Sequence, residues 1–190
     1  YLEMAEKTKK SFDEKFYNAG KHCLYDVLGD SKVRPNQLFA LSLSHPIVDN
    51  AKIAEQVLNT VENKLLNRYG LQTLSSDEEG YVDVYEGSAY NRDSSYHQGI
   101  TWPWLLGLYY DALKNTMIIE KNRTKRQELQ EKITKLVDTT KETFKAEMFE
   151  RSSIGTISEI YDSTEPYEER GAFAQAWSVA EIFRIVLNKR

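Results

Sequence analysis

The sequence predicts an all-α protein that forms about half of a helical toroid. Glycine and proline supply only 13 of the 190 residues, whereas average usage for the pair is about 12%. So few turn-forming residues cannot provide the many tight turns of a β-sandwich. Apolar residues recur at helical spacing, and short and long connections alternate between the helical segments. A full toroid of twelve helices needs more than about 300 residues, so this chain accommodates about half of one.

Six helices are expected, with recognisable start and stop signals. Gly20 follows the first helix and suits the left-handed position beyond a helix end. Pro35 occupies the first position of the second helix, and Asn50 caps the third. Residues 22–28 are expected to be short and extended. The expected helices cover residues 2–17, 35–44, 51–66, 101–119, 123–149 and 172–188.

Two long connections remain, over residues 71–100 and 150–170. Loops longer than about 12–15 residues are usually functional or disordered, and the tyrosines of the first loop argue against disorder. In the last helix, four side chains are expected to face inward: Phe173, Trp177, Ala180 and Leu187.

Composition excludes several other classes of protein. No apolar run reaches about 18 residues, so no membrane-spanning helix is predicted, and no signal peptide is recognisable. The net charge of −4 argues against nucleic-acid binding, which favours a basic face. The single Cys23 excludes an internal disulfide. The three histidines (His22, His45 and His97) lie far apart in the sequence, so we expect no metal site.

Two segments carry side chains that suit a sugar site, which needs polar groups for the hydroxyls and flat rings for the C–H face; only the second offers both. The first opens a predicted helix and offers an arginine and two amides, which could hold hydroxyl groups or only cap the helix. The second lies where the first long loop meets a helix, a place where function concentrates. It could equally be core aromatic residues around a satisfied histidine. The candidate residues are Arg34, Asn36, Gln37, Arg92, Asp93, His97, Gln98 and Trp102.

Two further segments frame the last helix. Glu159 and Asp162 lie three residues apart among apolar neighbours, which can raise the pKa of a carboxyl toward neutrality and suit a general base; the alternative is a solvated pair. The stretch around Gln175 and Trp177 alternates small residues with large ones. It could reach a ligand or allow close helix packing.

These segments, in this order, resemble the C-terminal amylo-α-1,6-glucosidase domain of bacterial and archaeal glycogen debranching enzymes. The matching strings run from about residue 12 to 184, and ordered motifs of this length are far more specific than one short pattern. They include RPNQ at 34–37, YGLQTL at 69–74, RD at 92–93, YHQG at 96–99, WPWLLG at 102–107, SEIYD at 158–162 and AQAWSVAE at 174–181.

The resemblance implies the C-terminal half of an (α/α)6 barrel, the six-hairpin toroid of glucoamylase-like glycosidases, with residues 1–190 as part of one domain. It implies hydrolysis with inversion of the α-1,6-linked glucose at glycogen branch points, a reaction of two carboxyl groups that needs no metal or other cofactor. The expected lack of a signal peptide and of disulfides favours the cytoplasm, where glycogen lies. By resemblance Glu159 is the general base, oriented by Ser158, Tyr161 and Asp162. The polar and aromatic candidates, together with Tyr161, Asp162, Gln175 and Trp177, are expected to bind the glucose.

One departure from the family pattern concerns the general acid. In the family this is an aspartate in a Trp-Met-Asp-like segment, but Met4, Met117 and Met148 are followed by Ala, Ile and Phe. We therefore expect this chain alone to be inactive, and to dimerise through its exposed half-barrel face. Three alternatives remain: an inverting glycosidase for another sugar, a non-catalytic α-glucan-binding helical module, and a purely structural helical domain.

Overall fold

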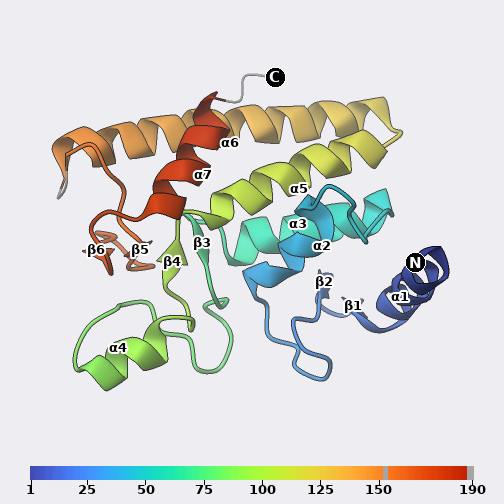
Figure 1. Ribbon diagram of the computed structural model, residues 1–190, viewed down its shortest axis with the longest axis horizontal. Helices are drawn as coiled ribbons and strands as arrows, with labels where there is room; N and C mark the ends of the chain where they lie inside the picture. Colours follow the sequence, from blue (N-terminus) through green and yellow to red (C-terminus); the bar gives the residue numbers. More distant parts are fainter. Residues whose placement is uncertain (152–153, 188–190) are drawn as a thin grey trace.

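The computed structural model describes residues 1–151 and 154–187 and is mostly helical, which confirms the predicted fold class (Figure 1). Within these residues no helix is long and apolar enough to cross a membrane. The helices are α1 (Leu2–Lys15), the 3-10 turn η1 (Pro35–Leu38), α2 (Phe39–Ser42), α3 (Ala51–Lys64), α4 (Ala89–Ser95), α5 (Leu105–Ile119), α6 (Arg123–Glu150) and α7 (Ala176–Leu187).

Side-chain caps fix where two of the long helices begin. The Asn50 side chain accepts hydrogen bonds from the backbone N–H groups of Lys52 and Ile53, as its position in the sequence predicts. Asn122 caps α6 in the same way. These bonds satisfy N–H groups that have no partner within the helix. Pro35 does open a helix, but as the 3-10 turn that leads into α2.

Helices α2, α3, α5, α6 and α7 form one layered core. In Figure 1, α5 and α6 lie side by side, α7 crosses both, and α2 and α3 lie on the opposite side of α5. Leu58 and Val61 of α3, Leu106 and Tyr110 of α5 and Ile182 of α7 are buried in one core. Gly107 of α5 lets the Glu181 side chain of α7 pack closely against it, since a Cβ at Gly107 would lie 1.7 Å from the Glu181 carboxylate.

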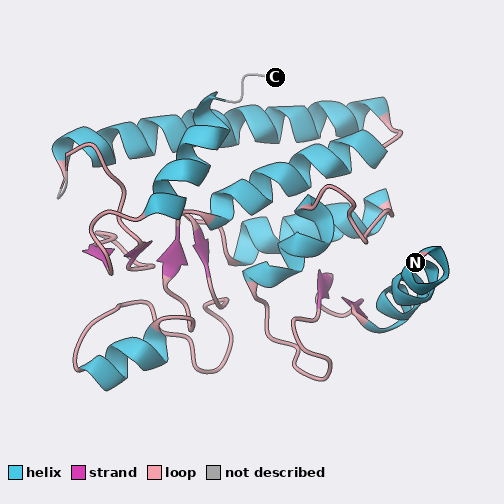
Figure 2. Ribbon diagram, in the orientation of Figure 1, coloured by secondary structure: helices cyan, strands magenta, loops and turns pink. Residues whose placement is uncertain are grey.

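Below α5, α6 and α7 in the view lies a small antiparallel sheet that the sequence did not predict (Figure 2). Its order is β3 (Leu71–Gln72), β4 (Thr101–Trp102), β5 (Ile160–Tyr161) and β6 (Glu169–Arg170). A second sheet pairs β1 (Tyr17–Asn18) with β2 (Cys23–Leu24). Strands of two residues are too short to show an alternating apolar pattern. The larger sheet brings the two predicted long loops together.

Several expectations for the helices differ from the structure. The segment before Leu105 is strand and turn rather than helix, and α4 lies within a predicted loop. The inward orientation predicted for the last helix is wrong at Phe173 and Leu187, which are about 70% exposed, and Ala180 is also exposed. Trp177 is 45% exposed. Only Ser178, Ile182 and Ile185 of α7 are buried, because α5 and α6 cover just one side of this apolar helix.

Candidate active site

Glu159 lies immediately before β5, and the neighbouring chain holds both its backbone and its side chain. Its backbone N–H donates to the Ala172 carbonyl at 2.9 Å, and the Ala172 N–H donates to the Glu159 Oε2 atom, also at 2.9 Å. Gly171 makes this approach feasible. It has a φ of +69°, and a Cβ there would lie 2.4 Å from Oε2. The carboxylate is therefore fixed by the β5–β6 side of the small sheet.

Tyr96 binds the other oxygen of Glu159, by donating its hydroxyl proton to Oε1. Burial and the neighbouring Glu159 charge raise the pKa of Tyr96, so its hydroxyl stays a donor at neutral pH. Each carboxylate oxygen has two lone pairs. Glu159 is only partly buried and can therefore accept a further hydrogen bond from water.

Aromatic rings form a continuous wall beside Glu159. Tyr96 packs edge-on against Trp102 with ring centroids 4.7 Å apart, and His97 stacks on Trp102 with centroids 5.3 Å apart. Trp177 of α7 contacts Trp102 at 5.9 Å and stacks on Trp104 at 5.5 Å. Trp102 itself is buried, and its indole N–H donates to the Tyr96 carbonyl. The exposed part of the wall is therefore formed by His97 and Trp177, and flat rings of this kind suit the C–H face of a sugar.

Arg34 ties the segments around this wall together. Its guanidinium donates to the carbonyls of Thr73 and His97 at 3.1 and 2.8 Å, and to the Gln98 side chain at 3.0 Å. Partial burial, and then the charge of Arg34, lower the pKa of His97 against the opposing effect of Asp93 and Glu159. His97 is therefore uncharged at neutral pH, with its ring stacked on Trp102.

Some of the predicted sugar-binding side chains are used inside the protein. Gln37 is buried and bonds the backbone of Leu24 and Arg34. Tyr161 is completely buried, and its hydroxyl donates to Glu147. Neither side chain reaches the surface of this structure. They stabilise the segments that carry the exposed groups.

Asp162 is also buried and fully engaged. It accepts a hydrogen bond from the Tyr85 N–H at 2.8 Å and two from the Arg170 guanidinium at 3.0 and 2.8 Å. These bonds join the 81–86 segment to β5 and β6. The geometry gives Asp162 a role in holding the strand that follows Glu159.

The remaining predicted residues lie at the surface around the wall. Asn36 donates to Asp26, and Arg92 of α4 donates to the Gly87 carbonyl at 2.6 Å. Asp93 is exposed on α4. Gln175 precedes α7, where its side chain accepts from the Ala176 N–H. The structure therefore brings Glu159, His97, Gln98, Trp102 and Trp177 into one region and leaves Asn36 on its periphery.

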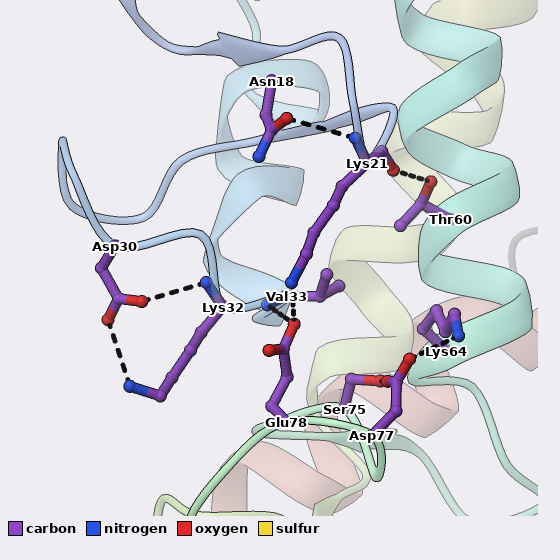
Figure 3. Close-up of polar contacts among 10 residues, drawn as sticks. All are labelled: Asn18, Lys21, Asp30, Lys32, Val33, Thr60, Lys64, Ser75, Asp77 and Glu78. Atoms are coloured by element: carbon purple, nitrogen blue, oxygen red, sulfur yellow. Dashed lines mark hydrogen bonds and ion pairs between the residues drawn. The ribbon is translucent and has the colours of Figure 1, made fainter.

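A cavity of about 400 Å³ lies elsewhere, between α3 and the turn at 75–78, and none of the predicted site residues lines it. Its charged groups are paired. Lys21 bonds Glu78 and Lys64 bonds Asp77, both at 2.7 Å (Figure 3). Glu78 also accepts from the Val33 N–H. Because Val33 directly precedes Arg34, these contacts hold the backbone from which Arg34 reaches the site.

Sequence reasoning missed Glu147, a buried carboxyl on α6 that accepts a hydrogen bond from Tyr161 in the strand following Glu159. The helical spacing from Leu136 through Thr140 and Phe144 to Glu147 was the available signal, since residues three or four apart share a helix face. All four are buried. Burial raises the pKa of Glu147 to about 7.

A partly exposed carboxylate beside a wall of aromatic rings is an arrangement typical of carbohydrate-active proteins. The mostly helical fold is consistent with a glucoamylase-like domain. The amylo-alpha-1,6-glucosidase family model matches residues 1–184, and the chain belongs to this family. Membership indicates a glycoside hydrolase of the amylo-α-1,6-glucosidase type.

Proposed function

We propose that this chain carries the general base and part of the sugar-binding wall of an inverting glycosidase. Its substrate would be the α-1,6-linked glucose at branch points of glycogen or a limit dextrin, a cytoplasmic glucan. The observation that supports this most strongly is the Glu159 carboxylate. Tyr96 and Ala172 hold it, it is partly open to solvent, and it lies beside the ring wall.

In this proposal Glu159 removes a proton from water while the water oxygen attacks the anomeric carbon. A carboxylic acid on the other side of the bond protonates the departing O6 atom, and the product is β-glucose. The two carboxyl groups of an inverting enzyme lie about 6.5–9.5 Å apart, which leaves room for the water. The hydrogen bonds to Glu159 would hold its oxygens in the position from which they can accept that proton.

We propose that the acid belongs to the other half of an (α/α)6 barrel, of which residues 1–190 form the C-terminal half. The exposed rings of Phe39, Phe173 and Trp177 support a missing partner surface. In the absence of that surface we expect this chain to release no glucose and to dimerise through these rings. Sedimentation of this chain, with Trp177→Ala for comparison, tests the dimer.

The test of the function is glucose release from a branched limit dextrin by the protein that joins this chain to its other half. Glu159→Gln keeps the size of the side chain but cannot accept the proton, so the rate should fall by roughly 10²–10⁴-fold. Glu165→Gln changes an exposed carboxylate in the next turn and serves as the matched control. An unchanged rate in Glu159→Gln would overturn the assignment.

The ring wall could also serve a glucan-binding module without catalytic activity. That function predicts maltooligosaccharide binding by the unmutated protein with no glucose released. Release of a different sugar from other substrates would instead indicate a related inverting glycosidase. Absence of both binding and release would indicate a structural domain.

A further inference from the structure

A buried cluster of side chains lies directly behind the strand that follows Glu159. Glu147, near the end of α6, is 2% exposed, and its Oε1 atom accepts a 2.9 Å hydrogen bond from the Tyr161 hydroxyl of β5. Arg151 lies with its Nε atom 2.8 Å from Glu169 of β6 and 3.6 Å from Glu147. Two carboxyl groups therefore share one guanidinium.

When both carboxyl groups are ionised, two of their buried oxygens lack a hydrogen-bond donor. Glu147 Oε2 and Glu169 Oε1 are buried, and neither accepts a hydrogen bond of good geometry from any residue in 1–151 or 154–187. Their nearest cation is Arg151, whose Nε atom lies 3.6 Å from Glu147 Oε2 and 2.8 Å from Glu169 Oε1 as an ion-pair partner. Buried polar atoms without partners are costly and rare. Glu169 is a hydrogen-bonding neighbour that helps to raise the pKa of Glu147, so a proton held by Glu147 can be donated to Glu169 and gives the buried oxygens a partner.

The surrounding charges favour one negative charge on the Glu147–Glu169 pair over two. The guanidinium of Arg151 also donates to the Tyr69 hydroxyl at 2.6 Å and to the Tyr167 carbonyl at 3.2 Å. Arg68 is the other cation on this side, but it lies over the Tyr69 ring at 5.8 Å and its Nε bonds Thr143. Among the described residues, the titratable groups that face this region are the two carboxyl groups, the phenols of Tyr69, Tyr161 and Tyr167, and the guanidinium groups of Arg151 and Arg68.

We propose that Glu147 and Glu169 share a proton, and that this protonated pair positions Glu159 by fixing strands β5 and β6 to the end of α6. The positioning role rests on the proposed function, because it assumes that Glu159 is the base. The shared proton does not depend on that function. Glu159 is two residues from Tyr161, and β5 is paired to β6 at Ile160–Arg170 and Tyr161–Glu169. Loss of the proton leaves two anions beside one guanidinium and loosens the strand that carries the base. Glu147 and Glu169 are therefore positioning residues.

Hydrogen exchange of the full chain tests the pair without any need for activity. After correction for the intrinsic rate, amides of the 159–162 segment should lose at least tenfold protection between pH 5.5 and pH 8.5. Glu147→Gln should remove this pH dependence, because its amide donates to Glu169 and accepts from Tyr161 at every pH. Glu142→Gln, an exposed change on the same helix, should behave like the wild type.

The same pH dependence in Glu147→Gln as in the wild type would overturn the proposal, as would its absence in the wild type. If Glu147→Gln does not fold, carboxyl ¹³C titration of the wild-type chain decides instead. The proposal requires one glutamate to titrate near neutrality, and its absence refutes the pair. In the assembled glucosidase, Glu147→Gln should move the alkaline fall of kcat to higher pH and leave KM unchanged. Failure of Glu159→Gln to lower the rate would reject the function but leave the exchange result intact.

Discussion

The substitution Glu147→Gln should change how the stability of this protein depends on pH. Burial raises the pKa of Glu147 from 4.5 to about 7 in the folded protein. A carboxyl with a raised pKa binds its proton more tightly when folded. Its stabilising contribution is therefore complete below pH 4.5 and disappears as the pH rises toward 7. At 1.36 kcal/mol for each pKa unit, this is about 3 kcal/mol.

The assay is urea unfolding of the wild-type, Glu147→Gln and Glu142→Gln chains between pH 5 and pH 8. The free energy of unfolding of the wild type should fall by about 2–3 kcal/mol relative to Glu147→Gln over this range. Taking the difference between variants removes the contribution of groups such as Asp77, whose pKa the bonds from Lys64 and Ser75 lower to about 2. Parallel curves for wild type and Glu147→Gln, or a loss of wild-type stability relative to Glu147→Gln toward low pH, would refute the reasoning.

Three further substitutions test the surroundings of Glu159. Tyr96→Phe keeps the ring but removes the donor to Glu159 Oε1, so kcat/KM should fall roughly 10–100-fold, the equivalent of a hydrogen bond to a charged group; an unchanged value would show that this bond does not matter. Gly171→Ala places a methyl group 2.4 Å from Glu159 Oε2 at a φ of +69°. It should cost about 1–3 kcal/mol of stability, measured by urea unfolding, and reduce activity. Trp177→Ala removes a 45% exposed ring and should weaken maltooligosaccharide binding about tenfold or more by calorimetry, with little loss of stability. Equal binding by Trp177→Ala and the wild type would show that Trp177 takes no part in binding the sugar.

The helices could be predicted because their signals are local. Asn50 precedes α3 and caps it, and the long apolar spacing of α5 and α6 continues over several turns. The helical content and the family membership are confirmed by the structure and the family match. The exposure of Phe173 could not be predicted, since an apolar pattern shows which face favours burial but not whether a partner covers it.

The small sheet and its consequences depend on contacts distant in sequence. Strands β4 and β5 pair Thr101 with Tyr161, and no pattern in two-residue strands indicates such a pairing. The roles of Arg34 and Gln37 follow from the same folding. Both are polar residues at a helix start, but one bonds the 96–98 loop and the other is buried against Leu24. Glu159 stays a prediction that rests on resemblance and is compatible with this geometry.

Chemical rescue of Glu159→Ala tests the central claim most directly. Removing a general base leaves a space in which a small anion can attack the anomeric carbon without needing a proton acceptor. In the assembled glucosidase, azide should therefore restore turnover of an activated α-glucoside, and the product should be β-glucosyl azide. No rescue in a correctly folded variant, or an α-glucosyl azide product, would contradict the assignment of Glu159 as the base of an inverting enzyme.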